Sequence, residues 1–216
     1  MNIGGSLSFE RISRYLPAAN GDFQTAFRLY LYNMKLCQEF YPVMSMTEIV
    51  FRNGIARALV NKYGENWHSN RGVLYRNLNS TGKNLIDEAV NKELSAHGVV
   101  TAHRVITGLS LGFWVRLLSP RGPNNLRLVD IKHAFPNLPQ GFVKRDLYNR
   151  AKSFRDFRNK IFHHHAVFDR APVREYQNMR TLVEWACEDS LWLMSTLANP
   201  IEVVSRKPRP FSANNP

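Results

Sequence analysis

Arginine, asparagine and histidine occur together in one short basic segment, "FRDFRNKIFHHHAVF", at residues 154–168. Asn159 and His163 are four residues apart, so on a helix they share one face. Arg158 precedes His163 by five residues, which places it about 7.5 Å away along a helix axis and about 140° around it. A long arginine side chain can turn towards the same cleft. The spacing therefore predicts a cluster whose chemistry suits a phosphodiester.

The chemistry expected of this cluster is RNA cleavage without a metal ion. Arg158 would hold a phosphate and the negative charge that grows in the transition state. His163 would accept the proton of a 2′-hydroxyl or donate one to the leaving 5′-oxygen, and Asn159 would position the pair. Because one histidine does not easily serve as acid and base at once, two copies of the chain about a two-fold axis would supply a second arginine and histidine. On spacing alone, a solvated basic helix face is the simpler explanation.

The three consecutive histidines, His163, His164 and His165, first suggest a metal site. Neighbouring residues on a regular helix point about 100° apart, so the three imidazoles cannot all bind one ion. Structural zinc sites use Cys or His pairs at other spacings, and the segment offers no fourth ligand nearby. We therefore expect no metal ion and no other cofactor. His164 is expected to support the site or to contact RNA rather than to catalyse.

The charge of the chain indicates its class of partner. Twenty-nine Lys and Arg against 17 Asp and Glu give a formal net charge of +12, and such an excess favours a polyanion, with nucleic acid as the default candidate. The excess is concentrated around the candidate cluster, because residues 141–180 hold ten Lys and Arg against four Asp and Glu. RNA is therefore the expected partner. The candidate contacts to it are Arg155, Lys160, Lys152 and His165.

The elements that must position these residues are predicted to be helices, because apolar residues recur at spacings of three and four. Asp22 is a good N-cap for a helix that Pro42 is expected to break or kink. Gly98 is expected to end a later helix. The full prediction is all-α, with a polar loop at 65–84 and helices at 8–16, 22–41, 45–64, 84–98, 99–120, 126–134, 142–164 and 173–197.

Chain length and apolar content favour a single domain over residues 1–200, with 65–97 as an inserted or variable segment. The basic, proline-containing tail at 201–216 is expected to be disordered. The spacing of Gly108 and Gly112 predicts close helix packing within a soluble core. No apolar run reaches the length of a membrane span, so no membrane partner is expected.

The two cysteines, Cys37 and Cys187, are isolated and lie in apolar helical patterns. No disulfide framework can be built from them. They are expected to be buried free thiols in a cytoplasmic protein.

Three stretches of the chain carry a family resemblance. "RNKIFH" fits the R-x4-H motif of the HEPN superfamily, and "RDFRNKIFHHHAVF" resembles the Arg-x-x-Arg-Asn-x-x-x-His-His segment of Abi-like (abortive infection AbiD/AbiF type) proteins. "LSLGFWVRLLS" at 109–119 is similar to their Gly-Phe-Trp core segment. The N-terminal half resembles theirs as well, including Glu48 and the Arg52-Asn53 pair. The matches come in family order over roughly residues 7–67 and 98–170.

The resemblance implies an all-α, HEPN-like helical bundle whose long antiparallel helix pair forms a homodimer. Two R-x4-H segments then make one composite site, in which Arg158, Asn159 and His163 carry the motif. Active members are metal-independent endoribonucleases that leave a 2′,3′-cyclic phosphate or 3′-phosphate and a 5′-hydroxyl. Abi-like members arrest phage-infected cells, and such toxins need an antitoxin, either a protein or a structured RNA.

The chain departs from the family pattern at two places. His165-Ala166 stands where the family commonly has Glu-Pro, and Lys160 stands where Arg is usual. These changes leave the motif intact, but they remove the support that the glutamate would give.

Two questions stay open at this point. Glu48 and Arg52 are spaced for a salt bridge within one helix, and the alternative is that Glu48 orients Arg158 or His163 from a neighbouring helix while Arg52 contacts RNA. The second question is the function itself. The alternative to an anti-phage nuclease is a non-catalytic RNA-binding protein that holds a structured non-coding RNA, and a helical adaptor is the least favoured reading.

Overall fold

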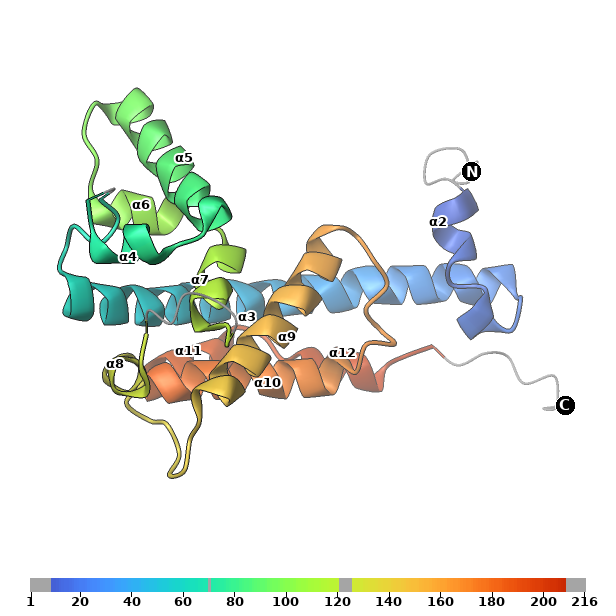
Figure 1. The fold of residues 1–216 in the computed structure, drawn as a ribbon. Coiled ribbons are helices and arrows are strands. Elements are labelled where there is room, and N and C mark those ends of the chain that lie inside the picture. Colours follow the sequence, from blue (N-terminus) through green and yellow to red (C-terminus); the bar gives the residue numbers. More distant parts are fainter. Residues whose placement is uncertain (1–8, 70, 121–125, 209–216) are drawn as a thin grey trace, which may run out of the picture.

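The computed structural model of the protein describes residues 9–69, 71–120 and 126–208. Within these ranges the chain forms helices and no strands (Figure 1), which confirms the all-α prediction. The elements are α2 (Phe9–Ser13), the 3₁₀ helix η1 (Pro17–Ala19), α3 (Phe23–Tyr63), α4 (Val73–Asn77), α5 (Ser80–His97), α6 (Ala102–Gly108), α7 (Leu111–Leu118), α8 (Leu128–Ala134), α9 (Lys144–Phe162), α10 (Pro172–Ala186), α11 (Glu188–Leu197) and α12 (Pro200–Ser205).

The long helix α3 is the element against which most of the other helices pack. It holds 41 residues, which corresponds to a length of about 60 Å. As predicted, the side chain of Asp22 caps its N-terminus by accepting a hydrogen bond from the N–H of Thr25 at 2.7 Å. Pro42 was predicted to break or kink the helix; a break is wrong, because α3 is continuous through that residue. Phe40 and Val43 are fully buried on either side of the proline, so packing offsets the cost of about 3 kcal/mol that an internal proline carries.

Helices α9 and α10 form an antiparallel pair that lies against α3. Arg150 Nη1 donates to Asn178 Oδ1 at 3.2 Å, and Ser153 Oγ donates to Glu175 Oε1 at 2.9 Å, so later residues of α9 meet earlier residues of α10. Helix α10 also packs directly on α3. The rings of Phe40 on α3 and Phe157 on α9 lie 4.9 Å apart between centroids. Helix α3 and the later pair α9 and α10 thus share one core.

The segment between α3 and α7 is more helical than predicted. The predicted loop at 65–84 contains α4 and the first residues of α5, which begins at Ser80 because Asn79 caps it through the N–H of Gly82. Gly98 ends α5 in a left-handed conformation, as predicted. Figure 1 shows α4, α5 and α6 together at one end of α3, away from α2.

The predicted single helix at 99–120 is wrong, because it is two helices, α6 and α7, interrupted at residues 109–110. Trp114 is fully buried, and its indole N–H donates to the carbonyl of Leu109 at the interruption, at 3.3 Å. Gly108 and Gly112 therefore lie in different helices. A Cβ on Gly108 would be in ordinary contact with Ala89 of α5, and one on Gly112 would meet only Ser110. The close approach predicted for this pair is not formed.

Two further predictions fail near the C-terminus. The single helix at 173–197 is interrupted at Cys187, whose backbone is extended (φ −170°). The tail from residue 201 was expected to be disordered, but residues 200–205 form α12, which packs on α3 and buries Val203. The hydroxyl of Tyr32 donates to the carbonyl of Val204 at 3.4 Å. Residues 209–216 lie outside the described residues.

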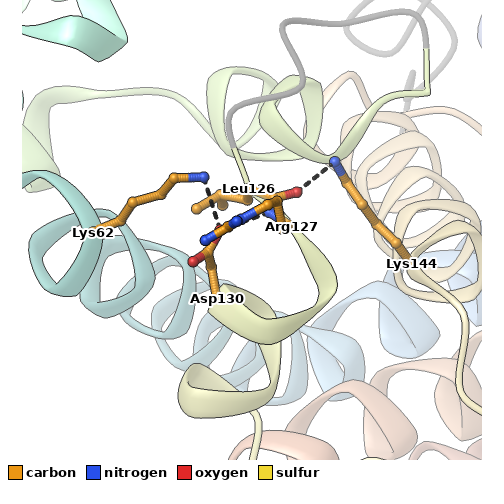
Figure 2. A network of polar contacts seen from close by, with 5 residues as sticks. All are labelled: Lys62, Leu126, Arg127, Asp130 and Lys144. Carbon is orange, nitrogen blue, oxygen red and sulfur yellow. Dashed lines mark hydrogen bonds and ion pairs between the residues drawn. The ribbon is translucent and has the colours of Figure 1, made fainter.

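Polar contacts connect helix α8 and the residues just before it to α3 and α9 (Figure 2). Lys62 at the end of α3 donates to Asp130 Oδ2 at 2.8 Å, and the N–H of Arg127 donates to the same oxygen at 2.7 Å. Lys144 at the start of α9 donates to the carbonyl of Leu126 at 2.9 Å. The helix predicted at 126–134 is confirmed, and these contacts fix the N-terminal end of α9.

Within the described ranges, no helix is both long and apolar enough to cross a bilayer. Both cysteines are free and half-buried. Burial raises the pKa of the Cys37 thiol to about 11. By contrast, hydrogen bonding to Ser190 lowers the pKa of the Cys187 thiol, which caps the N-terminus of α11.

Candidate functional site

The three histidines lie at the C-terminal end of α9 and just beyond it, not along a continuous helix. His163 is the C-cap, and its N–H still donates to the carbonyl of Asn159 at 2.9 Å. His164 adopts a left-handed backbone with φ 57°. The N–H of His164 donates to the carbonyl of Ile161 at 3.0 Å, and that of His165 donates to Lys160 at 2.9 Å. These two bonds are the Schellman pattern, which usually has glycine at the position of His164.

Asn33 of α3 holds the chain just after the histidines. Its side chain is buried; it accepts a hydrogen bond from the N–H of Val167 at 2.8 Å and donates to the carbonyl of His165 at 3.4 Å. Since a buried amide that loses such partners is costly, the contact fixes how the segment leaves α9. The sequence placed Asn33 on the apolar stripe of its helix, and a polar residue in that stripe was the signal of its role.

Arg158 is held by three neighbours. Its Nε donates to Glu48 Oε2 at 3.2 Å, and its Nη1 donates to Asn159 Oδ1 at 3.3 Å. The guanidinium carbon lies 4.1 Å from the centroid of the Phe162 ring, one turn further along α9. The arginine and the glutamate side chains are each 28% exposed, so the ion pair stays in contact with water. The arginine is therefore oriented, and it is still open to an anion from solvent.

Glu48 pairs across helices rather than along its own helix. Within the described residues its ion-pair partner is Arg158, whereas Nε of Arg52 donates to Asn53 Oδ1 at 3.3 Å. Glu48 and Arg52 still share the wall of a small hollow of about 220 Å³, whose other lining residues are Tyr41, Ser45, Ile49 and Phe162. The structure thus brings Glu48 to the predicted cluster. Arg52 and Asn53 lie beside the cluster on α3 and are half-buried, and no hydrogen bond or ion pair between described residues joins them to it.

His163 is exposed to solvent. Its ring lies 6.4 Å from the ring of His165, and no hydrogen bond between described residues joins its side chain to Arg158 or Asn159. Asn159 and His163 are one helical turn apart, as expected from their spacing. In the part of the chain that the structure describes, no three His, Cys, Asp or Glu side chains are arranged to hold a metal ion.

The predicted RNA contacts divide into two groups. Lys152 is exposed on α9, and Arg155 is paired with the neighbouring carboxylate of Asp156 at 2.7 Å. Lys160 and His165 instead line a hollow of about 310 Å³ between the end of α9 and α2. The other residues that line it are Arg11, Arg14, Tyr15, His164, Ala166, Asp169 and Arg170. Arg11 of α2 and Arg14, which follows α2, could not be predicted as part of this wall, because they are nearly 150 residues away in the chain.

A larger, more apolar groove of about 630 Å³ adjoins the same end of α9. It lies between α3, α9 and the end of α11, and its lining includes Met34, Tyr41, Phe162 and Leu197. All four of these side chains are exposed. The candidate cluster therefore borders an apolar surface that the described residues leave uncovered.

Comparisons with protein-family models, with curated proteins and with solved structures find no match. The roles of these residues therefore rest on their chemistry and geometry.

Proposed function

We propose that the protein is a metal-independent endoribonuclease of the HEPN type. The observation that carries the proposal is the state of Arg158, whose guanidinium is oriented by Glu48, Asn159 and Phe162 while it remains accessible to solvent. An arginine fixed in this way can bind a phosphate without first being ordered. The exposed His163, one turn beyond Asn159, supplies an acid or base at the same end of α9.

The proposed reaction is an in-line transesterification. The 2′-oxygen forms a bond to phosphorus while the bond from phosphorus to the 5′-oxygen breaks. One His163 takes the proton of the 2′-hydroxyl, and the His163 of a second copy gives a proton to the leaving 5′-oxygen. Arg158 stabilises the charge on the non-bridging oxygens. The products are a 2′,3′-cyclic phosphate and a 5′-hydroxyl, and no metal or other cofactor takes part.

A homodimer follows from this chemistry, and the apolar groove beside Phe162 supports it. Two copies that pack through this face would bring two Arg158–His163 pairs together about a two-fold axis. The exposed side chains of Met34, Tyr41 and Ile49 recur at spacings of seven and eight along one face of α3. An exposed apolar stripe next to the catalytic pair is what such an interface requires.

The proposed biological role is that of an abortive-infection toxin, which cuts RNA inside a phage-infected cell and is otherwise restrained by a protein or RNA antitoxin. This step rests on the resemblance to Abi-like proteins. The alternative function, holding a structured non-coding RNA without cutting it, is favoured by the ion pair between Glu48 and Arg158, which partly neutralises the arginine. RNA of one defined size that co-purifies without cleavage products would favour this alternative.

The test compares cleavage of total RNA, with EDTA present, by the wild type and by His163→Ala and Arg158→Ala. Each variant is expected to lose at least about 100-fold in rate, since acid–base and electrostatic groups contribute that much or more. Wild-type products should be labelled by a polynucleotide kinase without prior phosphatase treatment, which reports a 5′-hydroxyl.

Matched controls come from exposed residues away from the cluster. Arg145→Ala lies at the other end of α9, and His133→Ala lies on α8; both are expected to cleave like the wild type. Undiminished cleavage by both cluster variants, or complete loss of activity with EDTA, would contradict the nuclease proposal.

A further inference from the structure

The hollow between α2 and the end of α9 is strongly cationic and lies outside the Arg158 cluster. Arg11, Arg14, Lys160 and Arg170 line it, and Asp169 is the one carboxylate among its lining residues. Its volume of about 310 Å³ is at the lower end of the range for ligand pockets. A neutral or cationic ligand would not compensate these positive charges, which would then continue to repel one another.

Most of this positive charge has no ion-pair partner among the described residues. Arg170 is paired with Asp169 at 3.4 Å. Among the described residues, by contrast, no carboxylate lies within ion-pair distance of Arg11, Arg14 or Lys160. The C-terminus of α9 contributes roughly half a negative charge nearby, which is small against these full charges. The cavity is therefore suited to an anion.

The adjoining hollow on the other side of Lys160 serves as an internal comparison. It shares Lys160, Asp169 and Arg170, and it adds Arg174. However, its wall also carries the carboxylates of Asp156 and Glu175, so acidic and basic groups are nearly balanced. The excess of cations is specific to the hollow that α2 completes.

The floor of the cationic hollow is formed by a buried, packed side chain. Tyr15 is buried, and its ring stacks on Phe168 with centroids 5.6 Å apart. Burial raises the pKa of the Tyr15 hydroxyl to about 12, so the group is protonated at neutral pH and can donate a hydrogen bond. The α2 wall is held by Ile12, which is buried against the core. The backbone that carries Arg11 and Arg14 is thus anchored before an anion binds.

We propose that this hollow binds a phosphate group of RNA, separate from the phosphate at Arg158. This proposal rests on the proposed function, because it takes RNA as the polyanion. Lys160, His164 and His165 lie within five residues of Arg158–His163, so a strand held here continues towards the candidate active end of α9. The hollow would then fix the register of the strand, because phosphate contacts position a nucleic acid without reading its bases.

The experiment measures binding of a 2′-O-methyl RNA oligonucleotide, which keeps its phosphates and cannot undergo attack by a 2′-hydroxyl. Arg11→Ala/Arg14→Ala is expected to weaken binding about tenfold and to reduce the slope of log affinity against log salt by roughly 1.4, for two lost contacts to a single strand. The matched control, Arg76→Ala/Lys92→Ala, removes the same charge from exposed residues of α4 and α5 and should change affinity less than about threefold.

Two further measurements identify the source of the phosphate and test whether a loss of binding comes from misfolding. Lys160→Gln changes the opposite wall and should weaken RNA binding in the same direction. Inorganic phosphate, followed by ³¹P NMR, tests a free phosphate ligand: loss of its binding in Arg11→Ala/Arg14→Ala with unchanged RNA affinity would overturn the RNA assignment. Equal RNA affinity of the two double variants would overturn it as well. Failure of the nuclease proposal would be observed separately, as undiminished RNA cleavage by the Arg158→Ala variant.

Discussion

His164 occupies a backbone conformation that favours glycine. Its φ of 57° closes the Schellman turn at the end of α9, and the left-handed region costs a residue with a Cβ about 1 kcal/mol. Its side chain is exposed and borders both the cationic hollow and the apolar groove. A strained residue that touches two surfaces but contributes nothing to the core is typical of a functional position.

The prediction at this scale separates backbone from side chain. His164→Gly is expected to raise the free energy of unfolding by about 0.5–1 kcal/mol relative to His164→Ala, since only glycine relieves the left-handed strain. Both variants lose the imidazole, so RNA binding should weaken equally in the two. Urea denaturation and RNA titration of the pair provide the measurements. Identical unfolding curves for the two variants would show that the turn carries no strain.

At the scale of helices, α8 shows how one carboxylate can hold an element in place. Burial raises the pKa of Asp130, but hydrogen bonds from Lys62 and from the N–H of Arg127 lower it by more. The resulting pKa lies below the ordinary value. A lowered carboxyl pKa stabilises the fold at any pH above the unfolded value of about 4. That stability is lost as the pH falls through the folded pKa.

We therefore expect Asp130→Asn to lower the free energy of unfolding by about 1.5 kcal/mol at pH 7, because Lys62 loses a charged partner. The difference from the wild type should shrink steadily between about pH 5 and pH 3. Thermal or urea melts across this range measure it. Glu202→Gln, which removes an exposed ion pair with Arg206 on α12, is the control and should have little effect. A gap that stays constant down to pH 3 would contradict the role of the carboxylate.

The helices that could be predicted from the sequence are those with local signals. Asp22 caps α3 and Gly98 ends α5, because a cap depends only on residues within one turn. The continuity of α3 through Pro42 and the interruption before Trp114 depend on packing partners far away in the chain. For the same reason, the R-x4-H spacing was readable from the sequence, whereas the Asn33 contact and the α2 wall of the cationic hollow were not.

For the whole molecule, the arrangement of exposed apolar residues predicts how two copies meet. Ile49→Glu places a charge at one end of the α3 stripe, in the hollow that Ile49 shares with Phe162. We expect the wild type to be a dimer and this variant to be a monomer, because an unpaired charge in an apolar interface is costly. Size-exclusion chromatography with light scattering measures the mass.

Nuclease activity should decrease when the dimer is lost, although Arg158 and His163 are unchanged in Ile49→Glu. The matched control is Leu94→Glu, which adds the same charge at an exposed apolar residue of α5, away from this face, and should remain dimeric. A monomeric variant that cleaves RNA at the wild-type rate would exclude the composite site while leaving the cleavage chemistry itself intact.

The candidate site joins parts of the chain that are made at different times. Glu48 and Arg158 are 110 residues apart, and Asn33 and Val167 are 134 residues apart. At synthesis rates of about 5–20 residues per second, α3 leaves the ribosome roughly 5–20 s before the end of α9. During that interval the nascent chain has the glutamate but neither the arginine nor the histidine. The proposed nuclease is therefore incomplete until His163 has been translated, while the chain lies close to ribosomal and messenger RNA.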